Sequence, residues 1–334
     1  MARAQREKVM GYGFVGLATL LFSSMEISLK FCAGTYQSLQ LTMLRFLIGG
    51  IFLTPFALLK LKKDSLRLSL SVMGKLAAIS AVGLFLGMNL FQLAIEYTNA
   101  STVSVLFCTN TLFVSLFASF WLKEKIRRQT MVALFFQFLG VIAIILPGRK
   151  DFSTFGFASA LLSAIAFALY GVIGKKETCR YGGLVTTWFC SLAAGAEMLL
   201  YAFVSRIDSV AAYLNRIGLR DFADVPIFRG FSVETLPILL YVGIAVTGGG
   251  YLCYFMAMEY LPAQTASLVF FFKPALAPIL AMLILGEVIP FPMLVGILLI
   301  LFGSFWSLFG SRLTGKKRET FSFPGEGREE RGQN

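Results

Sequence analysis

Long apolar stretches, separated by short polar connections, follow one another along almost the whole chain. Several connections are only a few residues long, as between Tyr97 and Ser101, so consecutive helices have to run antiparallel. Ten stretches approach or exceed the roughly 20 residues that an α-helix needs to cross a bilayer. They cover about residues 11–30, 39–59, 75–95, 102–122, 130–147, 154–174, 184–205, 236–258, 264–285 and 290–310. The pattern predicts an all-α integral membrane protein with ten transmembrane helices.

The polar segments complete this plan. The first apolar run begins at Gly11 and is long enough to span, so we expect it to remain as the first helix rather than be removed as a signal peptide. Residues 1–10 then form a cytoplasmic N-terminus. The longest internal loop, about 206–235, is mixed in charge and is expected on the membrane surface. Residues 313–334 are charged and Gly-rich, which predicts a disordered tail.

The distribution of basic residues predicts the orientation. The side that contains the N-terminus carries 21 of the 30 Lys and Arg residues, and the other side carries six. Because basic loops are retained in the cytoplasm, both termini are expected there. The remaining three, Lys30, Arg45 and Lys273, fall within or at the edge of helices.

Composition narrows the function. Hydrophobic residues make up 57% of the chain and charged residues 14%, against roughly a quarter charged in soluble domains. The net charge is +12, but the basic residues lie in short loops beside apolar runs, which argues against nucleic-acid binding. The chain has no histidine and no GxxxxGK[ST] loop, so ATP hydrolysis is not expected. Its five cysteines lack a CxxC pair and suit packing better than a metal or disulfide. We expect no cofactor.

The two halves of the chain repeat each other. The segment at 87–101, GMNLFQLAIEYTNAS, aligns with the segment at 250–264, GYLCYFMAMEYLPAQ. The shift between them is 163 residues, called here the repeat offset, and it also relates Glu124 to Glu287 and Gly140 to Gly303. One offset that holds across three helices indicates duplication. Because each half contains an odd number of helices, the second repeat is expected to be inverted. Inverted repeats place a substrate site near the midplane, between the halves.

In these segments the chain resembles EamA-type members of the drug/metabolite transporter superfamily. The resemblance rests on FSSMEISLK (22–30), LRFLIGGIFLTPF (44–56), AIEYTNAS (94–101), WLKEKI (121–126), AMEYLPAQTAS (257–267), KPALAPILA (273–281) and LGEVIP (285–290). It implies two EamA repeats, at 11–147 and 154–310, in a ten-helix exporter or exchanger. It also implies that the fifth and tenth helices are peripheral and that the others surround a cavity. It implies no particular substrate.

Charged groups inside a membrane need a partner or water, so they are candidate functional residues. Glu26 lies one turn before Lys30, and either pairs with it or lines the external mouth as a proton or cation carrier. Arg45 and Glu197 are candidates for coupling or gating, and either could be the partner of the other. Without histidine, proton coupling would depend on Glu26 or Glu197.

Uncharged groups add to the candidate substrate contacts. Asn89, Gln92 and Asn110 are deep in their helices, and for these three residues hydrogen bonding between helices is favoured over substrate contact. At the repeat offset, Asn110 is the equivalent of Lys273, and Tyr254 is the equivalent of Phe91.

Lys273 is the leading candidate. It falls near the middle of its helix, too deep to reach either surface easily. Pro274 and Pro278 disturb the helix next to it, which is tolerated where backbone faces a cavity. Its ammonium would hold a substrate carboxylate or phosphate, or would neutralise Glu26 or Glu197.

These features predict a secondary-active transporter of small organic metabolites, such as amino acids, in the bacterial inner membrane. A membrane-embedded enzyme or signalling subunit is the alternative, and a passive channel is a third possibility. No convincing nucleophile and base pair supports an enzyme. The expected partners are a small-molecule substrate and lipid, with the chain a monomer or homodimer.

Overall fold

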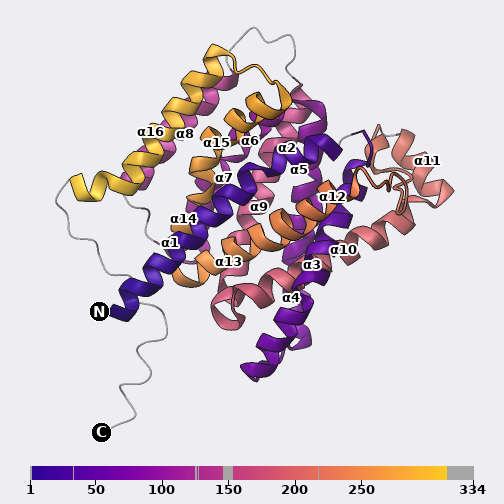
Figure 1. Ribbon diagram of the computed structural model, residues 1–334, viewed down its shortest axis with the longest axis horizontal. Helices are drawn as coiled ribbons and strands as arrows, with labels where there is room; N and C mark the ends of the chain where they lie inside the picture. Colours follow the sequence, from indigo (N-terminus) through magenta and orange to yellow (C-terminus); the bar gives the residue numbers. More distant parts are fainter. Residues whose placement is uncertain are drawn as a thin grey trace.

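The computed structural model describes residues 2–313 except 33, 125, 127, 146–152 and 217. The predicted end of the first repeat at residue 147 and the predicted tail beyond Leu313 therefore lie outside the described residues. The described part is a bundle of helices (Figure 1). Seven helical segments are long and apolar enough to cross a membrane: Gln5–Cys32, Ser38–Lys63, Leu70–Tyr97, Ala100–Trp121, Thr154–Tyr181, Gly183–Ser205 and Leu236–Tyr260. Three shorter apolar helical segments, Arg128–Ala143, Leu276–Leu285 and Phe291–Gly303, occupy the other three predicted positions.

Several of these segments consist of more than one helix. The first half of the chain contains α1 (Ala2–Ser23), α2 (Met25–Cys32), α3 (Ser38–Lys63), α4 (Leu70–Ser80), a π-helix η1 (Ala81–Leu86), α5 (Gly87–Tyr97), α6 (Ala100–Phe107), α7 (Asn110–Trp121) and α8 (Arg128–Ile145). The second half contains α9 (Thr154–Tyr181), α10 (Gly183–Ser205), α11 (Asp208–Arg216), the 3₁₀ turn η2 (Arg220–Phe222), α12 (Leu236–Leu240), a π-helix η3 (Tyr241–Gly250), α13 (Tyr251–Tyr260), α14 (Ala263–Ala266), α15 (Val269–Leu285) and α16 (Phe291–Leu313).

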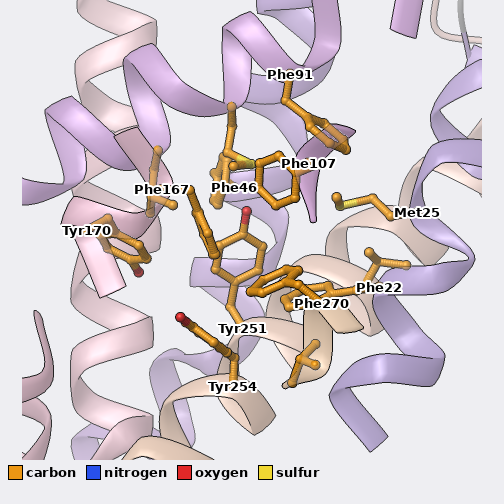
Figure 2. Close-up of a cluster of buried hydrophobic side chains, with 14 of the residues drawn as sticks. Phe22, Met25, Phe46, Phe91, Phe107, Phe167, Tyr170, Tyr251, Tyr254 and Phe270 are labelled. Atoms are coloured by element: carbon orange, nitrogen blue, oxygen red, sulfur yellow. The ribbon is translucent and has the colours of Figure 1, made fainter. Parts of the chain in front are cut away.

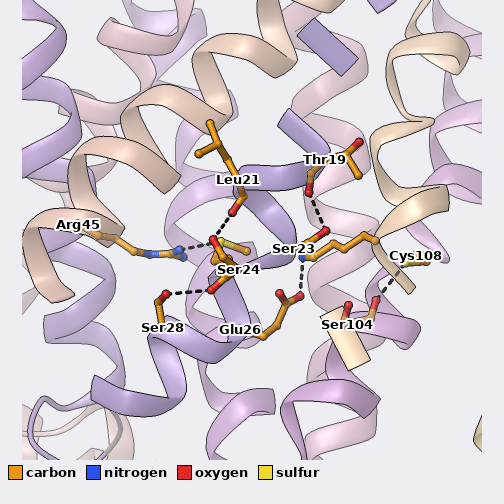
Figure 3. Close-up of polar contacts among 11 residues, drawn as sticks. Thr19, Leu21, Ser23, Ser24, Glu26, Ser28, Arg45, Ser104 and Cys108 are labelled. Atoms are coloured by element: carbon orange, nitrogen blue, oxygen red, sulfur yellow. Dashed lines mark hydrogen bonds and ion pairs between the residues drawn. The ribbon is translucent and has the colours of Figure 1, made fainter. Parts of the chain in front are cut away.

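Hydroxyl groups interrupt the first span between α1 and α2. Thr19, Ser23 and Ser28 each donate a hydrogen bond to the carbonyl four residues earlier, and Ser24 donates to Leu21 O, three residues earlier. Figure 3 shows the bonds donated by Ser23, Ser24 and Ser28. Such back-bonding competes with the helical ladder and bends helices. The break at Ser24 turns α2 so that Glu26 is fully buried. Glu26 is therefore not at the external mouth, which was one of the two positions that the sequence left open for it.

Corresponding helices of the two halves pack against each other at glycines. The helix α3 lies against α10, and α8 lies beside α16 at one edge of the bundle (Figure 1). A Cβ on Gly140 would lie 2.7 Å from the carbonyl oxygen of Gly296, and one on Gly303 would lie 2.9 Å from that of Ala133. The repeat offset relates Gly140 to Gly303 and Ala133 to Gly296, so the contact is reciprocal. Only glycine permits so close an approach of backbones.

Two carboxylates make equally reciprocal contacts at the helix connections. Glu124 accepts hydrogen bonds from the backbone N–H groups of Ala263 and Gln264, at 3.1 and 3.5 Å. Glu287 accepts from those of Ala100 and Ser101, at 3.0 and 3.1 Å. The repeat offset relates each acceptor and donor in one set to its counterpart in the other. Free N–H groups at a helix start are stabilised by an acceptor with negative charge.

Two lysines also bond equivalent carbonyl groups in the two repeats, although the lysines themselves are separated by fewer residues than the repeat offset. Lys175 donates to Leu261 O at 2.9 Å and forms an ion pair with Glu124 at 3.2 Å. Lys30 donates to Thr98 O at 3.2 Å and to Ile95 O at 2.8 Å. Thr98 and Leu261 are again equivalent at the repeat offset. We call Glu124 with Lys175 the first end clamp, and Glu287 with Lys30 the second end clamp.

Candidate functional site

Aromatic rings fill the middle of the bundle around a small cavity. Its walls come from both halves of the chain and are formed by Phe22, Met25, Met88, Phe107, Phe167, Tyr251 and Phe270. Figure 2 shows these side chains converging, with Tyr170 and Tyr254 beside them. The centre of the molecule is therefore nearly closed in this structure.

Lys273 and Glu26 form an ion pair next to this cavity. Nζ of Lys273, on α15, lies 2.5 Å from Oε1 of Glu26, on α2, and both residues are fully buried. The ammonium is also 5.2 Å from the ring centroids of Phe91 and Phe107, within the range of cation–π attraction. Of the two roles that the sequence left open for Lys273, the structure therefore contains the pairing with Glu26. The pair joins the first span to the helix with the two prolines.

Arg45 is the third fully buried charge, and no carboxylate in the described part of the chain forms an ion pair with it. It lies on α3, fully buried, and its Nη1 donates to the thioether sulfur of Met25 at 3.3 Å (Figure 3). Its guanidinium carbon is 5.0 Å from the ring centroid of Phe46. Nε and Nη2 have no hydrogen-bond partner in the described part of the chain. Thioether sulfur is a weak acceptor, so the guanidinium has no strong acceptor among the described residues.

Two ion pairs that the sequence left open as alternatives are not formed among the described residues. Arg45 does not pair with Glu197, because Glu197 Oε1 accepts instead from the hydroxyl of Ser80, at 3.3 Å on α4, and is only partly buried. Glu26 does not pair with Lys30, although both lie on α2, because the carboxylate of Glu26 pairs with Lys273 and the ammonium of Lys30 donates to the backbone carbonyls of Ile95 and Thr98.

The uncharged candidate residues differ in the hydrogen bonds that they form. Asn110, at the start of α7, donates to Ala164 O of α9 at 2.9 Å, so the predicted bond between helices is confirmed. Asn89 donates to Phe85 O within its own span, and no hydrogen bond reaches the amide of Gln92 in the described residues. For these two, the expected interhelical bond is wrong. Tyr254 lies beside Phe167 and Phe270, and its buried hydroxyl is unbonded among the described groups.

Sequence reasoning missed three residues of this region. Gln137 on α8 accepts a hydrogen bond from Thr111 at 2.7 Å and donates to Cys108 O, where the helix breaks between α6 and α7. Met25 and Tyr251 line the cavity on the side of Arg45. Apolar residues give no sign of such a position in one sequence. Gln137 is a lone polar residue in an apolar run, and that signal was available.

A comparison with known families identifies the architecture. The EamA-like transporter family matches twice, over residues 9–146 and 154–309. The chain belongs to the EamA-like transporter family. The two EamA repeats expected from the resemblance are thus confirmed, as is membership of the drug/metabolite transporter superfamily.

Individual proteins that are similar to this chain also carry transporter names. An "Uncharacterized transporter" of Clostridium kluyveri is 37% identical over 304 residues, which cover 88% of this chain and 91% of that protein. An "S-adenosylmethionine uptake transporter" of Rickettsia bellii is 26% identical over 62% of this chain and 65% of its own. One solved crystal structure shares the fold, with a TM-score of 0.66 at 16% identity over 93% of this chain and 99% of that one. The protein is a multi-pass membrane protein of a transporter family.

Proposed function

We propose that this protein is a secondary-active transporter, an exporter or exchanger, of small organic metabolites such as amino acids and their derivatives. It works by alternating access between two inverted repeats of five helices each. The reciprocal end clamps are the observation that carries this proposal. In an alternating-access carrier, one end opens while the other stays shut, and inverted repeats exchange their conformations to do so. Equivalent clamps at two places, made from equivalent residues, suit such an exchange.

The reciprocity also supports the inversion itself. Glu124 in the first repeat holds the start of α14 in the second, and Glu287 in the second repeat holds the start of α6 in the first. A two-fold relation between the repeats exchanges such contacts. With ten spans, the two clamps then lie at opposite membrane surfaces. The first, with Glu124, is at the cytoplasmic side, and the second, with Glu287, is at the outer side. The three short apolar helices count as spans in this proposal.

A passive channel is the less favoured function. A channel needs a continuous polar path, whereas apolar side chains surround the small central cavity here. An enzyme is not favoured either, because the relatives carry transporter names.

Glu26 is proposed as the coupling residue. It is the carboxylate that ties the two repeats together at the centre, whereas Glu197 contacts Ser80 of the first repeat nearer the surface. Protonation of Glu26 would remove its attraction for Lys273 and release α15 from α2. If transport depends on pH, Glu26→Gln is expected to abolish that dependence. A pH-dependent Glu26→Gln variant would contradict this role.

Counterflow in proteoliposomes tests the transporter proposal. Vesicles with purified protein are loaded with unlabelled compounds from a panel of the twenty amino acids, S-adenosylmethionine and phosphorylated metabolites, and uptake of the labelled compound is followed. A carrier gives transient accumulation that saturates, and a channel gives neither. Absence of uptake for the whole panel would contradict metabolite transport of this class.

Cysteine labelling tests the proposed inner-membrane orientation. Cys179, in the last turn of α9, is exposed, and the other four cysteines are buried. With both termini in the cytoplasm, a membrane-impermeant maleimide labels Cys179 in inside-out vesicles but not in intact cells. As a control, Val233→Cys with Cys179→Ala, in the exposed loop, is expected to label from outside. The opposite pattern would reverse the orientation.

A further inference from the structure

The three central charges do not balance. Arg45, Lys273 and Glu26 are all fully buried, and only Lys273 and Glu26 pair. No described carboxylate forms an ion pair with Arg45. The centre therefore carries one positive charge without an acid. An isolated buried charge is tolerated where it faces a cavity or a ligand.

The free part of the guanidinium has a definite shape. Nη1 is occupied by the sulfur of Met25, and the unbonded donors are Nε and Nη2. These two nitrogens form one edge of the planar guanidinium, with two roughly parallel N–H bonds. That edge matches the two oxygens of a carboxylate, which arginine binds in a bidentate manner.

Met25 lies between this charge and the cavity. It lines the cavity and is also the acceptor for Arg45. Phe46 continues the contact on the other side, because its ring is 5.0 Å from the guanidinium and 5.5 Å from the ring of Tyr251, another cavity residue. Methionine has three rotatable bonds and adapts its shape easily. A rotamer change of Met25 would therefore open the cavity toward Arg45 without moving a helix.

We propose that Arg45 is the substrate-binding residue of the central cavity, and that it holds the carboxylate of a monoanionic metabolite once Met25 turns aside. This inference rests on the proposed transport function and assigns its binding group. A carboxylate supplies one negative charge, which balances Arg45. A phosphate monoester carries about −1.5 to −2 at pH 7 and would leave the centre negative. Lys273 is already neutralised by Glu26, so it is not the anion site.

Thermal unfolding of the purified, detergent-solubilised protein provides the first test, because it needs no known substrate. Arg45→Gln removes a charge that no acid compensates, so the variant is expected to unfold at the wild-type temperature or above. Arg67→Gln, at an exposed position, is the matched control. A fall in unfolding temperature as large as that of Lys273→Met would assign Arg45 a structural role and overturn the proposal.

Ligand discrimination provides the second test. The probes are aspartate, glutamate, lactate and pyruvate, each with one net negative charge at pH 7, the carboxamide of each compound that stabilises the protein, and glucose 6-phosphate with inorganic phosphate as the phosphate arm. Wild type is expected to bind a carboxylate and to lose about 10- to 100-fold in affinity for its carboxamide. Arg45→Gln is expected to bind both forms equally weakly. Arg45→Lys is expected to be intermediate, because lysine keeps the charge but lacks the two-donor edge.

The outcomes separate this inference from the transport proposal. If counterflow of a panel compound persists in Arg45→Gln with an unchanged preference for the carboxylate, Arg45 is not the binding group, although transport stands. Tighter binding of the phosphate arm would overturn the monoanion assignment. A wild type that no probe stabilises would contradict the carboxylate site.

Discussion

The contacts at the two ends of this molecule are repeated in both halves of the chain, whereas the buried charges at its centre are not. At the ends, Glu124 and Glu287 hold equivalent backbone groups, and Lys30 and Lys175 bond equivalent carbonyls. At the centre, the repeat offset pairs Lys273 with the neutral Asn110. Lys30 and Lys175 are 145 residues apart, and at this spacing the equivalent of Glu26 is Gly171 and the equivalent of Arg45 is Cys190. The clamps are duplicated, and the charges are not.

The difference has a steric cause at one position. A Cβ on Gly171 would lie 2.7 Å from the hydroxyl oxygen of Tyr254, so no carboxylate fits there without moving the ring. The parts expected to alternate are therefore alike in both repeats. The part expected to recognise a ligand is different, because a metabolite has no such symmetry.

The largest predicted effect concerns the central ion pair. Lys273→Met is expected to lower the free energy of unfolding by about 3–5 kcal/mol, because Glu26 is left buried without its partner. Adding Glu26→Gln is expected to restore most of that loss. Thermal unfolding in detergent measures both, with the exposed Lys176→Met as control. Equal stability of Lys273→Met and wild type would show that the pair does not stabilise the fold.

Placing a charge at the equivalent position tests the asymmetry directly. Asn110→Lys introduces an ammonium that Gly171 cannot neutralise, so we expect a loss of about 2.5–3.5 kcal/mol. Asn110→Met, which is similar in length and uncharged, is the control for size. Thermal unfolding of Asn110→Lys at the temperature of the Met variant would mean that the centre accepts a second unpaired cation.

The clamps are predicted to act in opposite directions. Glu124→Gln weakens charge-assisted hydrogen bonds worth about 1.5–3 kcal/mol each and is expected to open the cytoplasmic end, whereas Glu287→Gln opens the outer end. In a variant that retains only Cys108, buried at the centre, labelling by an impermeant maleimide is expected to rise several-fold, from the cytoplasmic side in Glu124→Gln and from the outer side in Glu287→Gln. Glu234→Gln, in the exposed loop, is the control. Increased labelling from the same side in both variants would refute the inverted arrangement.

The smallest effect is expected at Glu197. Its contact with Ser80 is 3.3 Å long and only partly buried, so Glu197→Gln is expected to change stability by less than about 1 kcal/mol. It is also expected to keep any pH dependence of counterflow. Loss of that dependence in Glu197→Gln alone would move coupling away from the centre.

Sequence patterns predicted the helices well and their contacts only partly. Apolar run lengths located the seven helical segments long enough to cross a membrane and three shorter apolar ones, because backbone groups in lipid have to be bonded within a helix. The repeat offset, with the depth of Lys273, located the centre. The partner of Lys273 was left between two carboxylates, because choosing Glu26 depends on the break at Ser24. The isolation of Arg45 depends on side-chain directions across three spans, which no local pattern contains.

Both end clamps are closed in the same structure, and this has a consequence for the membrane as a whole. A carrier that passes through a state sealed at both surfaces has no moment at which its interior joins the two solutions. The aromatic wall between the clamps adds a dry barrier, since hydrophobic constrictions exclude water and ions. If the clamps lie at opposite membrane surfaces, as proposed, many copies can reside in an energised membrane without discharging its voltage.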